Sequence, residues 1–150
     1  MTLQQQRSDT GLATALRISV SRLARRLRVE RLVPEIAEPA LSDTQLAALA
    51  TLERHGAMSP GDLAEHEKVQ PPSMTRVIAA LVDWGLVTRA PHPTDRRQVI
   101  LTVTTDGRNL VQKVRRRKEA WLARRLAELS PQERAILREA APILEKLSQS

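Results

Sequence analysis

The stretch from Ser59 to Thr105 constrains the fold more than any other part of the chain. It holds two short segments whose apolar residues recur at helical spacing, followed by two short segments rich in β-branched residues. Gly85 separates the helical part from the strand part, as expected of a glycine that ends a helix. The order helix, turn, helix, hairpin predicts a winged helix-turn-helix, whose second helix enters a DNA major groove.

The two helical segments carry distinct local signals. Ser59 is predicted to cap the first, with Pro60 in its first turn. Gln70 and the pair Pro71-Pro72 open the second, where proline is tolerated because first-turn amides have no helical acceptor. The positions expected to face the core of the second helix are Val77, Ile78, Leu81 and Val82.

The opposite side of the second helix carries Ser73, Thr75 and Arg76. Hydroxyl groups reach phosphates and base edges, and arginine binds guanine or phosphate. Taken singly, Ser73 and Thr75 are better explained as ordinary surface or capping residues. The attached hairpin favours DNA binding for the unit as a whole.

The hairpin loop ends in Asp95, Arg96 and Arg97. An arginine at a hairpin tip can enter the narrow, electronegative minor groove. An aspartate would repel phosphate there, so we interpret Asp95 as orienting an arginine through a bidentate pair. The alternative is a solvated loop with random charges.

These residues resemble the MarR (multiple antibiotic resistance regulator) family of dimeric bacterial winged-helix repressors. The resemblance rests on Leu63-Ala64, Ser73-x-Thr75-Arg76, Leu81-x-x-x-Gly85-Leu86-Val87-x-Arg89, and Asp95-Arg96-Arg97 followed by Leu101-x-Val103-Thr104-x-x-Gly107. It implies an effector bound in a crevice between dimerisation helices and the winged region. Arg17 and His55 are candidate walls of that crevice, although a surface arginine and a helix-end histidine explain them equally well. Glu67-Lys68, where a glycine is often found, and the proline pair depart from the family pattern.

The charge balance favours a polyanionic partner, since 24 Lys and Arg against 17 Asp and Glu give a net charge of +7. The chain has no cysteine, which excludes disulfides and thiolate metal sites. Three scattered histidines and no glycine-rich phosphate loop offer no catalytic set, so we expect no enzyme, cofactor or metal. No apolar run is long enough to span a membrane and no signal-peptide core is present, so we expect a cytoplasmic protein.

The flanking segments, residues 10–32 and 105–148, are expected to form dimerisation helices around a winged region at residues 42–104. Residues up to about Asp9 are predicted to fray, and Pro34 and Pro39 to break the first helix. The apolar stripes from Leu12 to Leu27 and from Ile136 to Leu147 exceed what one small domain can cover, which favours a homodimer. A surface helix with a solvated face is the alternative for the first stripe.

The sequence therefore predicts one mainly α domain, residues 1–150, with a small β-hairpin wing. The predicted function is a ligand-responsive repressor that binds double-stranded DNA as a homodimer and responds to a small anionic or aromatic ligand. The alternative is a winged-helix module for protein–protein interaction. The candidate DNA-binding residues are Ser59, Gln70, Pro72, Ser73, Thr75, Arg76, Asp95, Arg96 and Arg97.

Overall fold

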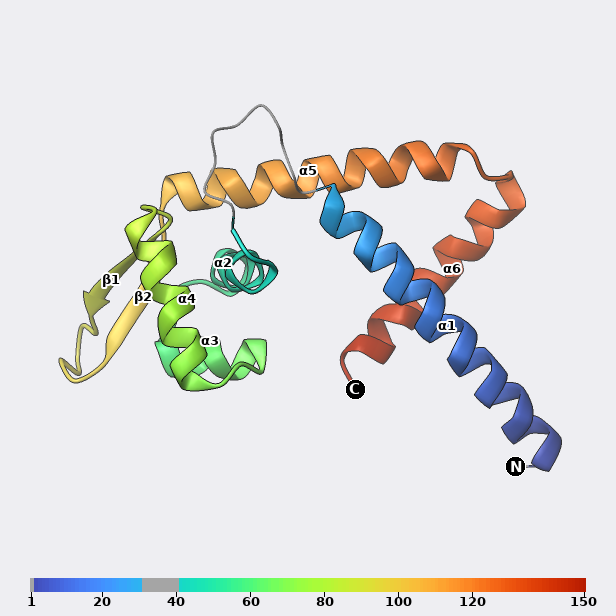
Figure 1. Ribbon diagram of the computed structural model, residues 1–150, viewed down its shortest axis with the longest axis horizontal. Helices are drawn as coiled ribbons and strands as arrows, with labels where there is room; N and C mark the ends of the chain where they lie inside the picture. Colours follow the sequence, from blue (N-terminus) through green and yellow to red (C-terminus); the bar gives the residue numbers. More distant parts are fainter. Residues whose placement is uncertain (1, 31–40) are drawn as a thin grey trace. The chain divides into compact units, whose positions relative to one another are not determined.

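The computed structural model describes residues 2–30 and 41–150, and within them the predicted order of helices and hairpin is confirmed (Figure 1). The elements are α1 (Leu3–Val29), α2 (Asp43–His55), α3 (Pro60–Glu67), α4 (Pro71–Asp83), β1 (Val87–Pro91), β2 (Val99–Val103), α5 (Thr105–Ala127) and α6 (Pro131–Ser148). The fold is mainly α with a two-stranded antiparallel hairpin, as expected. The chain divides into a winged unit within Leu32–Arg115 and a terminal unit within Met1–Arg31 and Arg116–Ser150.

Side-chain caps fix where the helices of the winged unit begin. Ser42 Oγ accepts a hydrogen bond from the Gln45 N–H at 3.1 Å, and Gln45 Oε1 accepts one from the Ser42 N–H at 2.9 Å. Ser59 Oγ accepts from the Asp62 N–H at 3.1 Å at the start of α3. These bonds satisfy amides that have no acceptor inside the helix, which is why the start of α3 could be predicted from Ser59.

The turn after α4 sends the chain from the helix into the hairpin. Gly85 has φ 71°, a left-handed conformation that glycine adopts without strain. The Leu86 N–H donates to the Leu81 carbonyl and the Gly85 N–H to the Val82 carbonyl, both at 3.0 Å. This is a Schellman motif, and the burial of Leu81 and Leu86 supplies its apolar contact.

The core of the winged unit is aliphatic, as expected of a chain without Phe or Tyr. Its most deeply buried side chains are Leu49, Leu52, Leu63, Met74, Leu81, Val87 and Leu101. The first half of α5 adds Leu110, Val111 and Val114 to this core. Residues 105–115, which the sequence assigned to the dimerisation helices, therefore help to build the winged unit.

The hairpin is tied into that core on both sides. β1 and β2 pair antiparallel, with Val87 opposite Val103 and Pro91 opposite Val99. Met58, which precedes α3, pairs with Leu101: their main chains exchange hydrogen bonds of 3.2 and 2.8 Å. The base of the wing is thus held by three chain segments.

The terminal unit contains α1, the second half of α5, and α6. Helix α1 begins at Leu3, so the predicted fraying up to Asp9 is wrong. Glutamine and arginine are good helix formers, and no proline or glycine interrupts residues 3–9. The predicted end of this helix at residue 32, with Pro34 and Pro39, lies outside the described residues. Trp121 is buried, and the guanidinium carbons of Arg26 and Arg125 lie 5.5 and 5.6 Å from its ring centroid.

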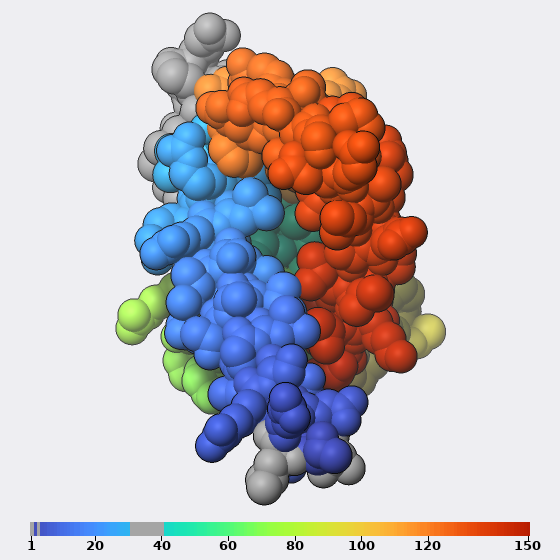
Figure 2. All heavy atoms as spheres, turned by 90° about the vertical axis from the view of Figure 1, so that its right-hand side faces the viewer, coloured from blue at the N-terminus to red at the C-terminus, as the bar shows by residue number. Residues whose placement is uncertain are grey.

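Helices α1, in blue, and α6, in red, both face the viewer in Figure 2. Both keep their apolar stripes exposed. No residue of α6 is buried, and Ile136 and Ile143 are 64% and 61% exposed. On α1, Leu12 is 58% exposed. Among the described residues, no helix is long and apolar enough to cross a bilayer.

Candidate nucleic-acid interface

The exposed face of α4 carries the side chains that the sequence assigned to DNA. Ser73, Thr75 and Arg76 are exposed, and so are Gln70 and Pro72 at the start of the helix. On the other side, Met74, Val77, Ile78 and Leu81 are buried. The helix is thus fixed through one apolar face while its polar face stays open to a ligand as large as DNA. Met74 was missed as a core residue because one methionine between polar neighbours gives little periodic signal.

The proline pair changes what the N-terminus of α4 can bind. A helix N-terminus normally attracts phosphate through its free first-turn amides. Pro71 and Pro72 have no N–H, so Ser73 carries the remaining first-turn amide. Ser73 can therefore offer a phosphate both its N–H and its hydroxyl. Gln70 makes no side-chain cap, which leaves its amide group available for DNA.

Thr75 differs from Ser73 in how its hydroxyl is used. Its Oγ1 donates to the Pro71 carbonyl at 3.0 Å. Toward DNA it therefore presents oxygen lone pairs and a methyl group, which suit an exocyclic amino group or a thymine methyl better than a phosphate. Arg76, one residue further, has an exposed side chain suited to phosphate or guanine.

The turn between α3 and α4 forms without the glycine that is frequent there. Lys68 takes the left-handed conformation with φ 52°, and the Val69 N–H donates to the Ala64 carbonyl at 3.0 Å. A side chain in this conformation costs about 1–2 kcal/mol. Half-buried Val69 packs on the core and offsets part of that cost. Ser59 lies at the start of α3, where its oxygen caps the helix and its O–H remains available as a donor.

The wing loop places Arg96 and Arg97 in solvent at the end of the hairpin. Asp95 Oδ1 accepts a hydrogen bond from the main-chain N–H of Arg97 at 3.1 Å. The predicted bidentate pair between Asp95 and an arginine side chain is not among the contacts of the described residues. Asp95 instead shapes the backbone from which Arg97 projects, as short polar side chains do in turns.

His92 also builds this loop, a role that the sequence analysis missed. Its Nδ1 lies 3.2 Å from the Thr94 N and 3.1 Å from the Asp95 N, and both N–H groups donate to it. The His92 N–H donates to the Gln98 carbonyl at 2.9 Å, which closes the loop. An acceptor two and three residues before the amides it binds is the spacing of a side-chain-capped turn, and that signal could have been found.

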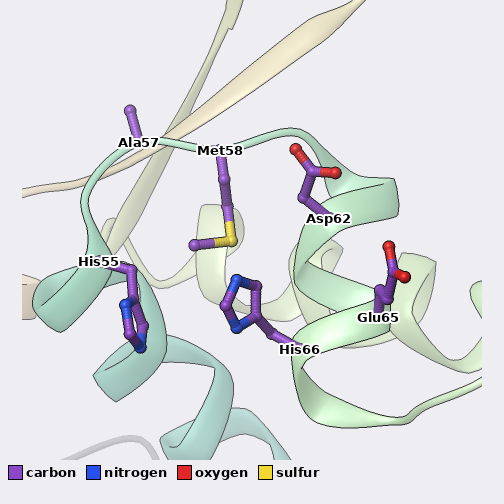
Figure 3. A pocket seen from close by; sticks show the side chains of 6 residues that line it. All are labelled: His55, Ala57, Met58, Asp62, Glu65 and His66. Carbon is purple, nitrogen blue, oxygen red and sulfur yellow. The ribbon is translucent and has the colours of Figure 1, made fainter.

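A second feature of the winged unit is a hollow between the end of α2 and α3. The imidazole rings of His55 and His66 stack there with centroids 5.0 Å apart (Figure 3). The hollow has a volume of about 500 Å³ and is lined by His55, Ala57, Met58, Asp62, Glu65 and His66. No group of three or more His, Asp or Glu within the described residues is placed to hold a metal ion.

Arg17 is exposed on α1 in the terminal unit, so the structure does not bring it together with His55 in one unit.

Comparisons of sequence identify the relatives of this chain. A model of the MarR family matches residues 41–99. The uncharacterised HTH-type transcriptional regulator Mb0904 of Mycobacterium bovis is 50% identical over 137 residues, which cover 91% of this chain and 92% of that protein. The HTH-type transcriptional repressor MdtR of Bacillus subtilis is 28% identical, over 96% of this chain and 90% of its own.

Solved structures share this fold over all or most of the chain. A Pseudomonas aeruginosa protein described as a transcriptional regulator has a TM-score of 0.82 and 30% identity, covering 100% of this chain and 99% of its own. BpsR of Bordetella bronchiseptica, whose DNA binding is regulated by 6-hydroxynicotinic acid, has a TM-score of 0.64 and 26% identity over 92% of this chain and 93% of its own.

Proposed function

The chain belongs to the MarR family of winged helix-turn-helix transcriptional regulators, and from this premise we propose that it is a ligand-responsive repressor that binds a near-palindromic operator as a homodimer. The family is one of transcription regulators, not enzymes. The observation that carries the proposal is the exposed polar face of α4 beside an arginine-tipped wing in one compact unit. In this arrangement Ser73 and Arg76 contact phosphate, Thr75 meets a base edge, and the wing reaches the minor groove.

The homodimer is supported by the exposed apolar stripes of α1 and α6. Large exposed apolar surfaces usually mark an interface, and a second copy of the chain would cover both stripes at once. Two-fold symmetry would then place two α4 helices about 34 Å apart, which is one turn of DNA. An operator with two inverted half-sites follows from that spacing.

Repression and ligand response are supported by the relatives. MdtR is named as a repressor, and the DNA binding of BpsR is regulated by a small aromatic carboxylic acid. A small anionic or aromatic effector is therefore the class that we propose. Arg17, exposed on α1, and His55, at the hollow of the winged unit, are separate candidate contacts. Arginine suits a carboxylate because its planar fork can form a bidentate pair.

Selection of bound fragments from genomic DNA tests this function. The expected result is a set of fragments that share an inverted repeat with half-sites one turn apart and that resist competition by unrelated DNA. A variant with Arg96→Ala and Arg97→Ala serves as the control and should lose the enrichment. Fragments without a common sequence, displaced equally by any competitor, would favour the protein-interaction module instead.

A further inference from the structure

His92 directly follows β1 at the start of the wing loop and is half-buried. Its Nδ1 accepts the N–H groups of Thr94 and Asp95 at 3.2 and 3.1 Å and lies 3.2 Å from Thr94 Oγ1. Asp95 in turn accepts the Arg97 N–H and, through its carbonyl, the Gln98 N–H at 3.0 Å. One imidazole nitrogen is therefore the centre of the turn that carries the wing arginines.

This geometry requires a particular protonation state of the ring. An imidazole nitrogen that accepts two N–H groups cannot carry a proton, so the neutral ring must hold its proton on Nε2. Protonation would place an Nδ1–H against the amides of Thr94 and Asp95, turning two hydrogen bonds into donor–donor contacts. Histidine is the side chain whose charge ordinarily changes between about pH 5 and 8.

We infer that His92 is a positioning residue for operator binding: its neutral imidazole holds the wing loop in the conformation that aims Arg96 and Arg97, and protonation of the ring releases that loop. The inference rests on the proposed function, since it assumes that the wing contacts DNA. Low pH should then weaken binding because the loop changes conformation, and not because of the charge that the proton adds.

Loop release and added positive charge predict opposite effects of low pH on DNA affinity. The loop carries Asp95, Arg96 and Arg97, β1 carries Arg89, and β2 carries no charged residue. The helices packed on the hairpin carry Arg76 and Asp83 on α4, Asp43, Glu53, Arg54 and His55 on α2, and Asp62, Glu65, His66 and Glu67 on α3. The start of α5, which meets the base of the hairpin, carries Asp106 and Arg108. A proton on His92 adds positive charge beside DNA, so a purely electrostatic role predicts tighter binding at low pH. Release of the loop predicts weaker specific binding.

The test compares wild type, His92→Asn and His92→Leu in titrations of one selected operator at fixed ionic strength, at about pH 8 and about pH 5.5. Asparagine offers an Oδ1 acceptor for the same amides but does not titrate, whereas leucine keeps bulk without an acceptor. Wild type should lose about tenfold more affinity than His92→Asn on acidification. His92→Leu should bind weakly at both pH values. The asparagine variant retains His55 and His66, so it also controls for their protonation.

A second measurement needs no DNA. Nitrogen NMR of the wild-type ring should show the Nε2–H tautomer at about pH 8, and the Thr94 and Asp95 amide signals should shift when the pH is lowered to about 5.5. Equal pH dependence in wild type and His92→Asn, tighter wild-type binding at low pH, or the Nδ1–H tautomer would each overturn the inference. Failure of wild type to bind any fragment at about pH 8, with the expected tautomer present, would overturn the proposed function and the DNA-binding role of His92, but not the loop geometry.

Discussion

At the wing tip, the charge of Asp95 is unfavourable for DNA binding, whereas its hydrogen bond is favourable for the loop conformation. Its carboxylate would repel DNA phosphates nearby, while its Oδ1 accepts a hydrogen bond from the main-chain N–H of Arg97. Since the acceptor does not need the charge, the two effects can be separated by substitution. The arginine itself is harder to replace, because a guanidinium is more weakly hydrated than an ammonium and loses less on entering a narrow groove.

We predict that Asp95→Ala weakens operator binding by about tenfold, because the loop loses a hydrogen bond that aims Arg97. Asp95→Asn, which keeps the acceptor and removes the charge, should bind at least as tightly as wild type. Arg97→Lys should resemble Arg97→Ala, since lysine lacks the planar fork. Titration of all four variants against one operator at fixed salt measures these effects. Tighter binding by Asp95→Ala, or wild-type affinity in Arg97→Lys, would show that the wing acts only through its positive charge.

Arg76 is predicted to act mainly through phosphate, because its exposed side chain lies in the second turn of α4, close to Ser73. Arg76→Ala should weaken binding to all DNA sequences and flatten the dependence of log affinity on log salt by about one unit. Titrations of operator and unrelated DNA at several salt concentrations provide the measurement. An unchanged salt slope with lost preference at one base pair would make Arg76 a base-contacting residue.

At the scale of elements, local signals predicted most of the fold. The cap at Ser59 and the glycine at Gly85 predicted the start of α3 and the end of α4, because these interactions span only three or four residues. The start of α1 was not predicted, since polar helix formers leave no apolar period. The bridge between Met58 and Leu101 and the division of α5 between two units depend on contacts between distant segments, which no local pattern contains.

The junction between the wing and α5 requires Gly107. A Cβ at this position would lie 2.3 Å from the Leu86 carbonyl oxygen and 2.9 Å from Val103 Cγ2. Thr104 holds the two segments together, because its Oγ1 donates to the Gly85 carbonyl at 2.7 Å and accepts the Gly107 N–H at 3.1 Å. Separation of α5 from the base of the hairpin would therefore break these hydrogen bonds.

Gly107→Ala should therefore lower the free energy of unfolding by about 2–4 kcal/mol, because the clash is with main-chain atoms. Gly61→Ala in α3 is the matched control: its Cβ would approach only Ser59 Oγ, at 3.9 Å. That substitution should raise stability by about 0.5–1 kcal/mol, as alanine does in helices. Chemical denaturation of the three proteins measures both changes. Equal stability of Gly107→Ala and wild type would show that the junction can relax.

At the scale of the whole molecule, the terminal helices α1 and α6 leave their apolar stripes exposed. Their stripes have regular helical spacing, yet α6 buries no residue within the chain. The sequence could predict these stripes from their period, but not which surface covers them, because pairing between copies depends on shape across an interface. Leu144, 39% exposed in one chain, lies on the α6 stripe, whereas Arg138 lies on the opposite side of the helix.

We predict that Leu144→Asp converts a stable dimer into a folded monomer, because dimerisation would then bury an unpaired carboxylate. The dimer dissociation constant should rise by at least roughly a hundredfold. Arg138→Asp introduces the same side chain off the stripe and should leave the dimer intact. Light scattering at micromolar concentration measures the mass, and circular dichroism confirms that each variant is folded. Operator affinity should fall with the dimer, since each half-site alone retains only one α4 helix. A wild-type protein that is a well-folded monomer at this concentration would contradict the prediction and leave the two stripes to a different partner.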